Sequence, residues 1–374
     1  MLPQFQQLSM LRKFSLDELA RLTDAEILQL FRTARWGKSD NPNEVVCPQC
    51  GKRHIAYWIR ARQQWQWQWQ CKHCQRRFSV TSGTVFANHK ISLRKILICL
   101  FEFAIAAKGI SATRIAAILG IQHKHAWALL HKLCDNLNSS KDLSPLNGEV
   151  HIDGGYFNYH IRPKNFKHKR IDRRAKRNQR QDKSCVLVFR QKSADYHKIK
   201  GADRTIVAQI KEENTQDMLA LTRLLVKQDS EICADENPAY NNLNFHYNRW
   251  SVNHQEAYSA KGVNNNLVES FNARFRDLHR GVHHKTDNKY ALHYANQVAF
   301  MSDNRRKSNG ELFSDVLQRC LWVLPLKEWV GYWQGNHRQD ELIGMKAFAP
   351  EEISQNYFKR LEEQMKYDEM LLAA

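Results

Sequence analysis

Four cysteines in two close pairs have the type and spacing of metal ligands. Cys47, Cys50, Cys71 and Cys74 form a C-x2-C-x20-C-x2-C frame. Zinc binds four thiolates in a tetrahedron, and each C-x2-C turn can supply two of them. Because four protein ligands would fill the coordination sphere, the frame predicts a structural zinc (Zn²⁺) with no open position for a catalytic water.

Three acidic residues that are far apart in the sequence could form a second site. Asp153 and Asp235 each end an apolar, strand-like run, where a buried carboxylate is costly unless it is paired or binds a cation. Glu269 falls in the first turns of an expected helix, and Arg276 lies two turns further along the same face. Taken singly, such residues are usually caps, turn residues or weak surface ion pairs. Two aspartates in separate strands nevertheless invite comparison with two-metal phosphate chemistry.

The composition favours a polyanionic partner. The chain has 374 residues, which suggests two or three domains, and 57 Lys and Arg against 38 Asp and Glu give a net charge of +19. A merely basic soluble protein is the plain alternative. No apolar run is long enough to span a membrane, and the N-terminus lacks a signal-peptide pattern. We therefore expect that the protein does not associate with a membrane and that it is located in the reducing cytoplasm.

The elements that must position the cysteines are short. Capping boxes at Ser15 and Thr23 predict two helices before residue 36. The runs HIAYWI, QWQWQWQC and RRFSVTSGTVF are β-type, and the last two look like the rungs of a small zinc ribbon. Trp65, Trp67 and Trp69 alternate on one strand face. Packing over a small metal-held core is favoured for them over stacking on nucleic-acid bases.

A helix, a turn and a second helix follow the cysteines. Residues 111–119 and 122–133 are amphipathic, and Gly120 separates them. This layout is that of a helix-turn-helix, although a generic helical hairpin has the same periodicity. His123, Lys124 and His125 begin the second helix, where such helices touch DNA.

A basic segment, residues 161–183, lies between the first two expected strands of the second half. It carries eleven Lys or Arg against two Asp. Such a run is usually a solvated loop. Because it follows the Asp153 strand, we expect non-specific contact with the DNA backbone, including contact through Arg170, Arg173, Arg174 and Arg177.

Residues after about 147 mix strands and helices, so the expected fold class is α/β. The domain boundaries that we expect are a helical segment at 1–43, a zinc ribbon at 44–88, a helix-turn-helix at 89–140, a catalytic domain at 147–310 and a helical extension at 311–374.

Taken together, these features resemble a known family of insertion-sequence transposases. Its members carry a zinc ribbon and a ribonuclease-H-like DDE core, and the family is the one numbered fifteen-ninety-five among insertion sequences. The blocks that carry the resemblance are RRFSVTSGTVFANHKISLRK, HIDGGYF, CADENPAY, VNNNLVESFNARFRD and HHKTDNKYALHYANQVAFMSDNRR. They occur in the family's order over roughly residues 20–315.

The resemblance implies a ribonuclease-H-like mixed sheet flanked by helices and a transposase that acts on double-stranded DNA. Asp153, Asp235 and Glu269 would hold two Mg²⁺ ions, for which Mn²⁺ could substitute. The zinc ribbon and helix-turn-helix would recognise terminal inverted repeats, and Arg276 would bind phosphate. The protein would act as a homodimer or higher oligomer on the DNA of a bacterial cytoplasm, associated with the nucleoid.

Several positions depart from the family pattern. Gly154 follows the first aspartate where Glu is usual, Asn272 stands where Trp commonly follows Phe, and Arg276 replaces a more common Lys. Some members use Asn as the third catalytic residue, so Asn266 is a rival to Glu269. These departures leave two alternatives open, namely a catalytically inactive DNA-binding regulator and a simple nuclease.

Overall fold

A computed structural model gives the fold of the chain. It describes residues 14–59, 68–157, 166–170, 184–196, 201–252, 265–284, 286–323, 329, 331–336, 342–344 and 348. The chain forms two compact units. One contains residues 142–305, and the other contains the residues up to 141 together with 306–337.

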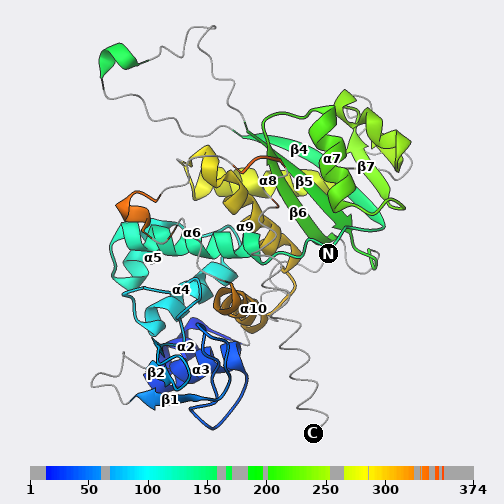
Figure 1. The fold of residues 1–374 in the computed structure, drawn as a ribbon. Coiled ribbons are helices and arrows are strands. Elements are labelled where there is room, and N and C mark those ends of the chain that lie inside the picture. Colours follow the sequence, from blue (N-terminus) through cyan, green and yellow to red (C-terminus); the bar gives the residue numbers. More distant parts are fainter. Residues whose placement is uncertain are drawn as a thin grey trace. The chain divides into compact units, whose positions relative to one another are not determined.

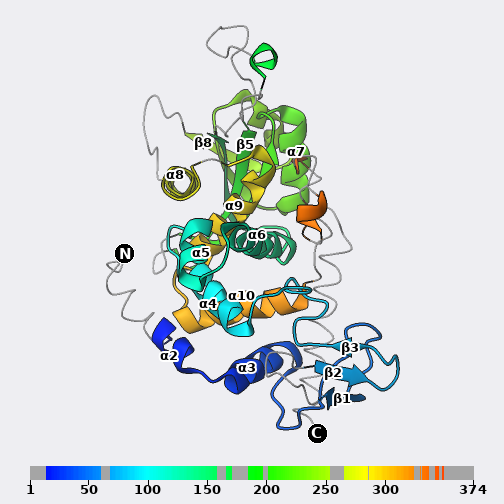
Figure 2. The same ribbon diagram turned by 90° about the vertical axis from the view of Figure 1, so that its left-hand side faces the viewer.

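The unit with the cysteines begins with two helices, α2 (Leu16–Arg21) and α3 (Asp24–Trp36). Both begin at the expected capping boxes, because Ser15 and Thr23 each exchange hydrogen bonds with a glutamate three residues later. A three-stranded antiparallel sheet follows, with β2 (Gln68–Cys71) between β1 (Ala56–Ile59) and β3 (Arg77–Phe78). These strands lie beside α3 (Figure 2).

Four helices complete this unit. They are α4 (Leu93–Ile105), α5 (Ala112–Leu119), α6 (His123–Ser139) and α10 (Asn309–Trp322), with a short 3-10 turn η7 (Tyr332–Gln334). Gly120 ends α5 in the left-handed conformation that glycine adopts without strain, with φ +57°. The α10 helix packs on α3, α4 and α6 although it is distant in sequence. Its first helical turn is fixed by a capping box at Ser308.

The second unit is built on a five-stranded mixed sheet in the order β6-β5-β4-β7-β8 (Figure 1). Its strands are β4 (Glu149–Phe157), β5 (Ser184–Lys192), β6 (Ala202–Ile210), β7 (Glu231–Asp235) and β8 (Asn248–Val252). The first three are antiparallel neighbours, whereas β7 lies parallel to β4 and β8 parallel to β7. The predicted α/β class is therefore confirmed at the level of a mixed sheet flanked by helices.

Helices cover both faces of this sheet. On one face α7 (Thr215–Leu225) and the 3-10 segment η4 (Pro238–Phe245) close an apolar core with the strands. On the other face lie α8 (Asn266–Gly281) and, after a 3-10 turn η5 (Asn288–Tyr290), α9 (Ala291–Asp303). A further 3-10 turn, η2 (Lys167–Lys169), lies in the basic segment. Because side chains alternate across a strand, neighbouring residues of β4 face these two layers in turn.

One strand prediction was wrong in extent. In RRFSVTSGTVF only Arg77 and Phe78 form a strand, and turns occupy the rest of the segment. The reason is local, since Ser82 Oγ accepts a hydrogen bond from the Ser79 N–H and Thr84 Oγ1 donates to the Thr81 carbonyl. Within the described parts of the chain, no helix combines the length and the apolar character needed to cross a bilayer.

Candidate active site and metal sites

The two cysteine pairs lie on two turns of the same design. The N–H of Gly51 donates to the Cys47 carbonyl, and the N–H of Gln75 donates to the Cys71 carbonyl, each over 2.9 Å. Gly51 and Gln75 both have positive φ, +70° and +56°, at the position after the second cysteine of their pair. Each C-x2-C segment is thereby folded back so that both of its thiols point the same way.

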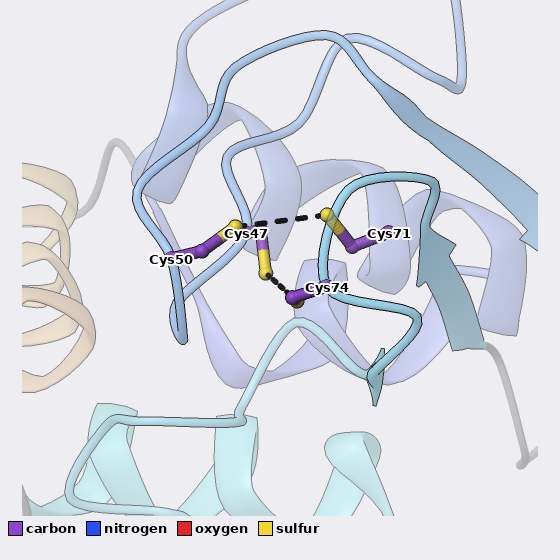
Figure 3. Close-up of side chains that lie close together, drawn as sticks. All are labelled: Cys47, Cys50, Cys71 and Cys74. Atoms are coloured by element: carbon purple, nitrogen blue, oxygen red, sulfur yellow. Dashed lines mark hydrogen bonds between the residues drawn. The ribbon is translucent and has the colours of Figure 1, made fainter.

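The four thiols gather at one point (Figure 3). Cys47 Sγ lies 3.6 Å from Cys74 Sγ, and Cys50 Sγ lies 3.7 Å from Cys71 Sγ, with no disulfide among them. Burial raises the pKa of Cys71, but hydrogen bonds from backbone N–H groups and neighbouring thiols outweigh it and leave the pKa at about 7. Four converging thiols of this kind fit a structural Zn²⁺, which binds thiolates.

Trp69 is the tryptophan of the alternating Trp65, Trp67 and Trp69 pattern whose packing the structure describes. Its side chain is fully buried, and its ring contacts those of Trp36, Trp58 and Phe78. The indole N–H donates to the Pro42 carbonyl over 2.8 Å. The packing interpretation therefore holds for Trp69, whereas Trp65 and Trp67 lie outside the described residues.

Two of the predicted carboxylates stand on adjacent parallel strands. Ile152 of β4 is paired with Ala234 of β7, so the next residue on each strand is an aspartate, Asp153 and Asp235. Asp235 is the last residue of β7, at the end where β4 continues without this neighbour. The sheet thus brings together two carboxylates that are 82 positions apart in the chain.

The third carboxylate comes from α8. Glu269 lies in the first turn of this helix, and Asn272 lies one turn further on. Asn272 Nδ2 donates to Asp153 Oδ2 over 3.2 Å, which brings the helix against β4. Asn266 is exposed at the first position of α8, and Arg276 is exposed near its middle.

The charges of this cluster act on one another. Burial, followed by the negative charges of Glu213, Asp235 and Glu269, raises the pKa of Asp153 to about 7, although the Gly154 N–H opposes the shift. Asn272 also holds a buried Oδ1 with no hydrogen-bond partner. Carboxylate and amide oxygens are the donors that Mg²⁺ and Mn²⁺ prefer, and a cation would relieve the repulsion. The types of donor atom therefore suit a divalent cation. Within the described residues, however, the groups of three or more such side chains that lie within 4.8 Å of one another are the four cysteines and the set Glu149, His151 and Cys233.

Glu213 and Asn272 lie beside Asp153 in the fold, and the sequence analysis did not identify either as a candidate site residue. In the sequence, Asn272 is conspicuous only as a departure from the family pattern. Its spacing of three residues from Glu269 on a helix nevertheless indicates that the two side chains lie on the same helix face. Glu213 lies in the sequence KEENT between a strand and a helix, which reads as an exposed charged turn. Only the folded chain brings it near Asp153.

The structure describes some of the residues that we expect to contact DNA. His123, Lys124 and His125 are exposed in the first turn of α6, after the left-handed turn at Gly120. Arg170 is exposed beside the short turn η2. Arg173, Arg174 and Arg177 lie outside the described residues.

Comparisons with known proteins match both units. Residues 145–303, which run from before β4 to the end of α9, match the ISXO2-like transposase domain. Residues 22–77, which contain all four cysteines of the frame, match the transposase zinc-ribbon domain. Together the two matches cover more than half of the chain. A comparison with curated proteins finds no match.

Proposed function

Because the chain belongs to the fifteen-ninety-five family of zinc-ribbon insertion-sequence transposases, we propose that it breaks and joins DNA strands at a site formed by Asp153, Asp235 and Glu269. The observation that carries this proposal is the parallel pairing of β4 with β7, which puts Asp153 and Asp235 at neighbouring positions of adjacent strands. The three carboxylates come from two strands and one helix, within the part of the chain that matches the transposase domain. The strand order, with three antiparallel strands followed by two parallel ones, supports a ribonuclease-H-like core.

Each residue of the proposed site would have its own role in binding the metal ions or the DNA. Asp153, Asp235 and Glu269 would hold two Mg²⁺ ions, or Mn²⁺ in their place. Such ions, when bound, supply the Lewis acidity that activates a water and stabilises a leaving 3′ oxygen. Asn272 orients the Asp153 carboxylate through its hydrogen bond. Arg276, exposed two turns along α8 from Glu269, would bind a backbone phosphate.

The reaction would have two steps of the same kind. A water adds to the phosphorus at the end of the element, and the bond to the 3′ oxygen breaks, which leaves a free 3′-OH. That hydroxyl then attacks a phosphate of the target DNA, and a target 3′ oxygen leaves. The number of phosphodiester bonds is conserved in the second step, so it needs no external energy source.

The other unit would select the DNA. A zinc-held ribbon and the α5–turn–α6 pair, acting as a helix-turn-helix, would recognise the terminal inverted repeats. Exposed His123, Lys124 and His125 at the start of α6 support this role, because recognition helices contact bases and phosphates with their N-terminal residues. Joining requires two ends, so we expect at least a dimer on bacterial double-stranded DNA in the cytoplasm.

The proposal is tested by strand transfer with purified protein, labelled end DNA, a target plasmid and Mg²⁺. Asp235→Ala and Glu269→Gln should each lower joined product at least about a hundredfold, while Asn266→Ala should retain activity within a fewfold range. Asp229→Ala, an exposed acid before β7, is the matched control. Equal product from Asp235→Ala and the unchanged protein would sink the catalytic assignment. DNA binding without product would indicate a regulator, and cleavage without joining would indicate a nuclease.

A further inference from the structure

A second group of side chains that can bind a metal lies on the adjacent strands β4 and β7. Glu149 and His151 are two positions apart on β4, so their side chains lie on the same face of the sheet. Cys233 of β7 is paired directly with His151, and both of these residues are buried. One ligand atom from each of the three residues lies within 4.8 Å of the other two. The strand pairing thus brings a carboxylate, an imidazole and a thiol together.

The Glu149 carboxylate directs its two oxygens at different partners. Oε1 lies 2.9 Å from His151 Nε2 and 3.9 Å from Cys233 Sγ. Oε2 accepts a hydrogen bond from Lys192 Nζ over 2.5 Å. Lys192 therefore holds the carboxylate through the oxygen that faces neither the imidazole nor the thiol. Carboxylates that bind metals are commonly held by a hydrogen bond of this kind from a residue outside the ligand set.

The separations of the ligand atoms suit one small ion. In a tetrahedral zinc site with bonds of ordinary length, a nitrogen and an oxygen ligand are about 3.4 Å apart, and a sulfur and an oxygen ligand are about 3.6 Å apart. The distances from Glu149 Oε1 to His151 Nε2 and to Cys233 Sγ, 2.9 Å and 3.9 Å, differ from these by about half an ångström or less. Small side-chain movements would therefore place all three atoms around an ion.

The types of donor atom select the ion. Imidazole, thiolate and carboxylate are ligands of Zn²⁺, whereas Mg²⁺ takes oxygen ligands. In addition, His151 Nδ1 is buried and has no hydrogen-bond partner among the described residues. Because buried polar atoms are nearly always paired, the hydrogen bonds of the folded chain leave this ring incompletely satisfied.

We propose that Glu149, His151 and Cys233 form a second Zn²⁺ site, separate from the cysteine frame and from the acids of the proposed function. On binding, the Cys233 thiol loses its proton to water, and the three side chains leave one tetrahedral position for a water molecule. Glu149 also lines a cavity of about 430 Å³, which gives the ion a route from solvent. The ion would join β4 to β7 two positions before Asp153 and Asp235, and would stabilise the strand pairing that places these aspartates.

The test is titration with Co²⁺ of the full-length protein whose cysteine frame already holds Zn²⁺. Co²⁺ takes the same ligands, and four thiolates favour Zn²⁺, so the ion of the frame should stay in place. Binding to the Cys233 thiolate should give a sulfur-to-cobalt charge-transfer absorption that saturates at one equivalent per chain. Cys233→Ser should lack this absorption, and Glu149→Gln should bind Co²⁺ at least about tenfold more weakly. Exchange at the frame would appear equally in Cys233→Ser, so the difference between the two proteins measures the second site.

Glu231→Gln is the matched control, because Glu231 is exposed and is paired with Glu149 across the same two strands. It should bind Co²⁺ as the unchanged protein does. The same absorption in Cys233→Ser and in the unchanged protein, or none in either, overturns the inference. Circular dichroism checks folding. If Cys233→Ser does not fold, Glu149→Gln decides, and unchanged Co²⁺ affinity there overturns the inference. None of these outcomes bears on the strand-transfer test of the proposed function.

Discussion

At the scale of single residues, Gly154 has a packing role that cannot be inferred from its position after the first aspartate. The space that a side chain would fill there is occupied by the Glu213 carboxyl group and by Cys185 Sγ, which lies 2.8 Å from an added Cβ. The family usually carries Glu at this position, so Gly154 could be taken as a sign of lost activity. The structure gives it a local reason instead, since an acid reaches this point from another segment.

Gly154→Ala should therefore destabilise the protein. The added methyl group forces Glu213 away from Tyr240 or displaces the buried Cys185, and overpacking of this kind typically costs about 1–3 kcal/mol. The measurement is the free energy of unfolding in urea. Gly281→Ala is the control, because nothing lies within 4 Å of its Cβ position and its φ is ordinary. A Gly154→Ala protein as stable as this control would contradict the packing argument.

Residue types alone predicted part of the candidate site. A cysteine frame has a spacing that few other structures require, and an aspartate that ends an apolar run is conspicuous because burial is costly. Glu213 belongs to no motif with a characteristic spacing, and it does not end an apolar run. It lies in a charged turn whose residues look solvated, and its environment is created by Gly154 and Tyr240, which come from two other strands or their connections. Sequence reasoning cannot find a residue whose neighbours all come from elsewhere in the chain.

At the scale of elements, we expect the stability of the zinc ribbon to depend on its metal more than on its own core. Its strands have only two to four residues, and few side chains besides Trp69 and Phe78 are buried in them. Small folds of this size need a metal or a disulfide to be stable. The four thiols that converge here supply that constraint only when they bind an ion.

Removal of zinc with a strong chelator should unfold β1 to β3 and expose Trp69. We expect the tryptophan emission to shift to longer wavelength, because a fully buried indole becomes hydrated. Cys47→Ser should show the same emission without chelator and no further shift when chelator is added. Hydrogen exchange in β4 and β5, measured by mass spectrometry, should not change. Increased exchange in these strands would show that the metal also stabilises the second unit.

At one end of the two central strands, β4 and β5, lies an ion network with a defined pH dependence. Glu149 on β4 contacts His151 Nε2 over 2.9 Å and Lys192 Nζ over 2.5 Å. These partners, His151 first, lower the pKa of Glu149 to about 2 from the ordinary value of 4.5, against the effect of burial. A carboxylate with a lowered pKa in the folded state stabilises the fold above its ordinary pKa, and this stabilisation is lost as the pH falls toward the folded-state value.

The unchanged protein should therefore lose stability more steeply between pH 5 and pH 3 than Glu149→Gln does, because the glutamine cannot be protonated in this range. Urea unfolding at a series of pH values provides the comparison. Glu231→Gln is the control, since Glu231 is the paired residue on the neighbouring strand and is exposed. Parallel stability curves for the unchanged protein and Glu149→Gln would mean that the network contributes nothing in acid.

At the scale of the whole molecule, the order of the modules could be predicted, but the contacts between distant segments could not. Capping boxes and Gly120 mark helix ends locally, so α2 and α3 begin and α5 ends at the expected residues. The α6 helix begins at His123 as expected but continues to Ser139, six residues beyond the expected end at residue 133. Nothing local indicates that β7 pairs with β4 rather than with β5 or β6. The parallel pairing that joins Asp153 to Asp235 requires the crossover through β5, β6 and α7. Likewise, nothing in the sequence of α10 indicates that it packs on helices near the other end of the chain.

The net charge of +19 leads to a prediction about DNA binding by the whole protein. Each phosphate that a Lys or Arg neutralises releases counterions, so the logarithm of the binding constant falls with the logarithm of salt concentration by about 0.9 per contact. Replacing Arg173, Arg174 and Arg177 with Gln should lower that slope by roughly two to three. Affinity for end DNA and for unrelated DNA should fall together, because backbone contacts carry no sequence information.

The matched control neutralises Arg223 and Lys227, two exposed cations in and after α7, and should leave the slope unchanged. Fluorescence anisotropy with both DNAs at several salt concentrations gives the slope and the discrimination in one experiment. The segment 161–183 is attached to the strand that bears Asp153, so its contacts would hold DNA near the acidic cluster regardless of sequence. If the triple variant kept its salt slope but lost preference for end DNA, the segment would read bases instead, and sequence recognition would not belong to the zinc ribbon and α6 alone.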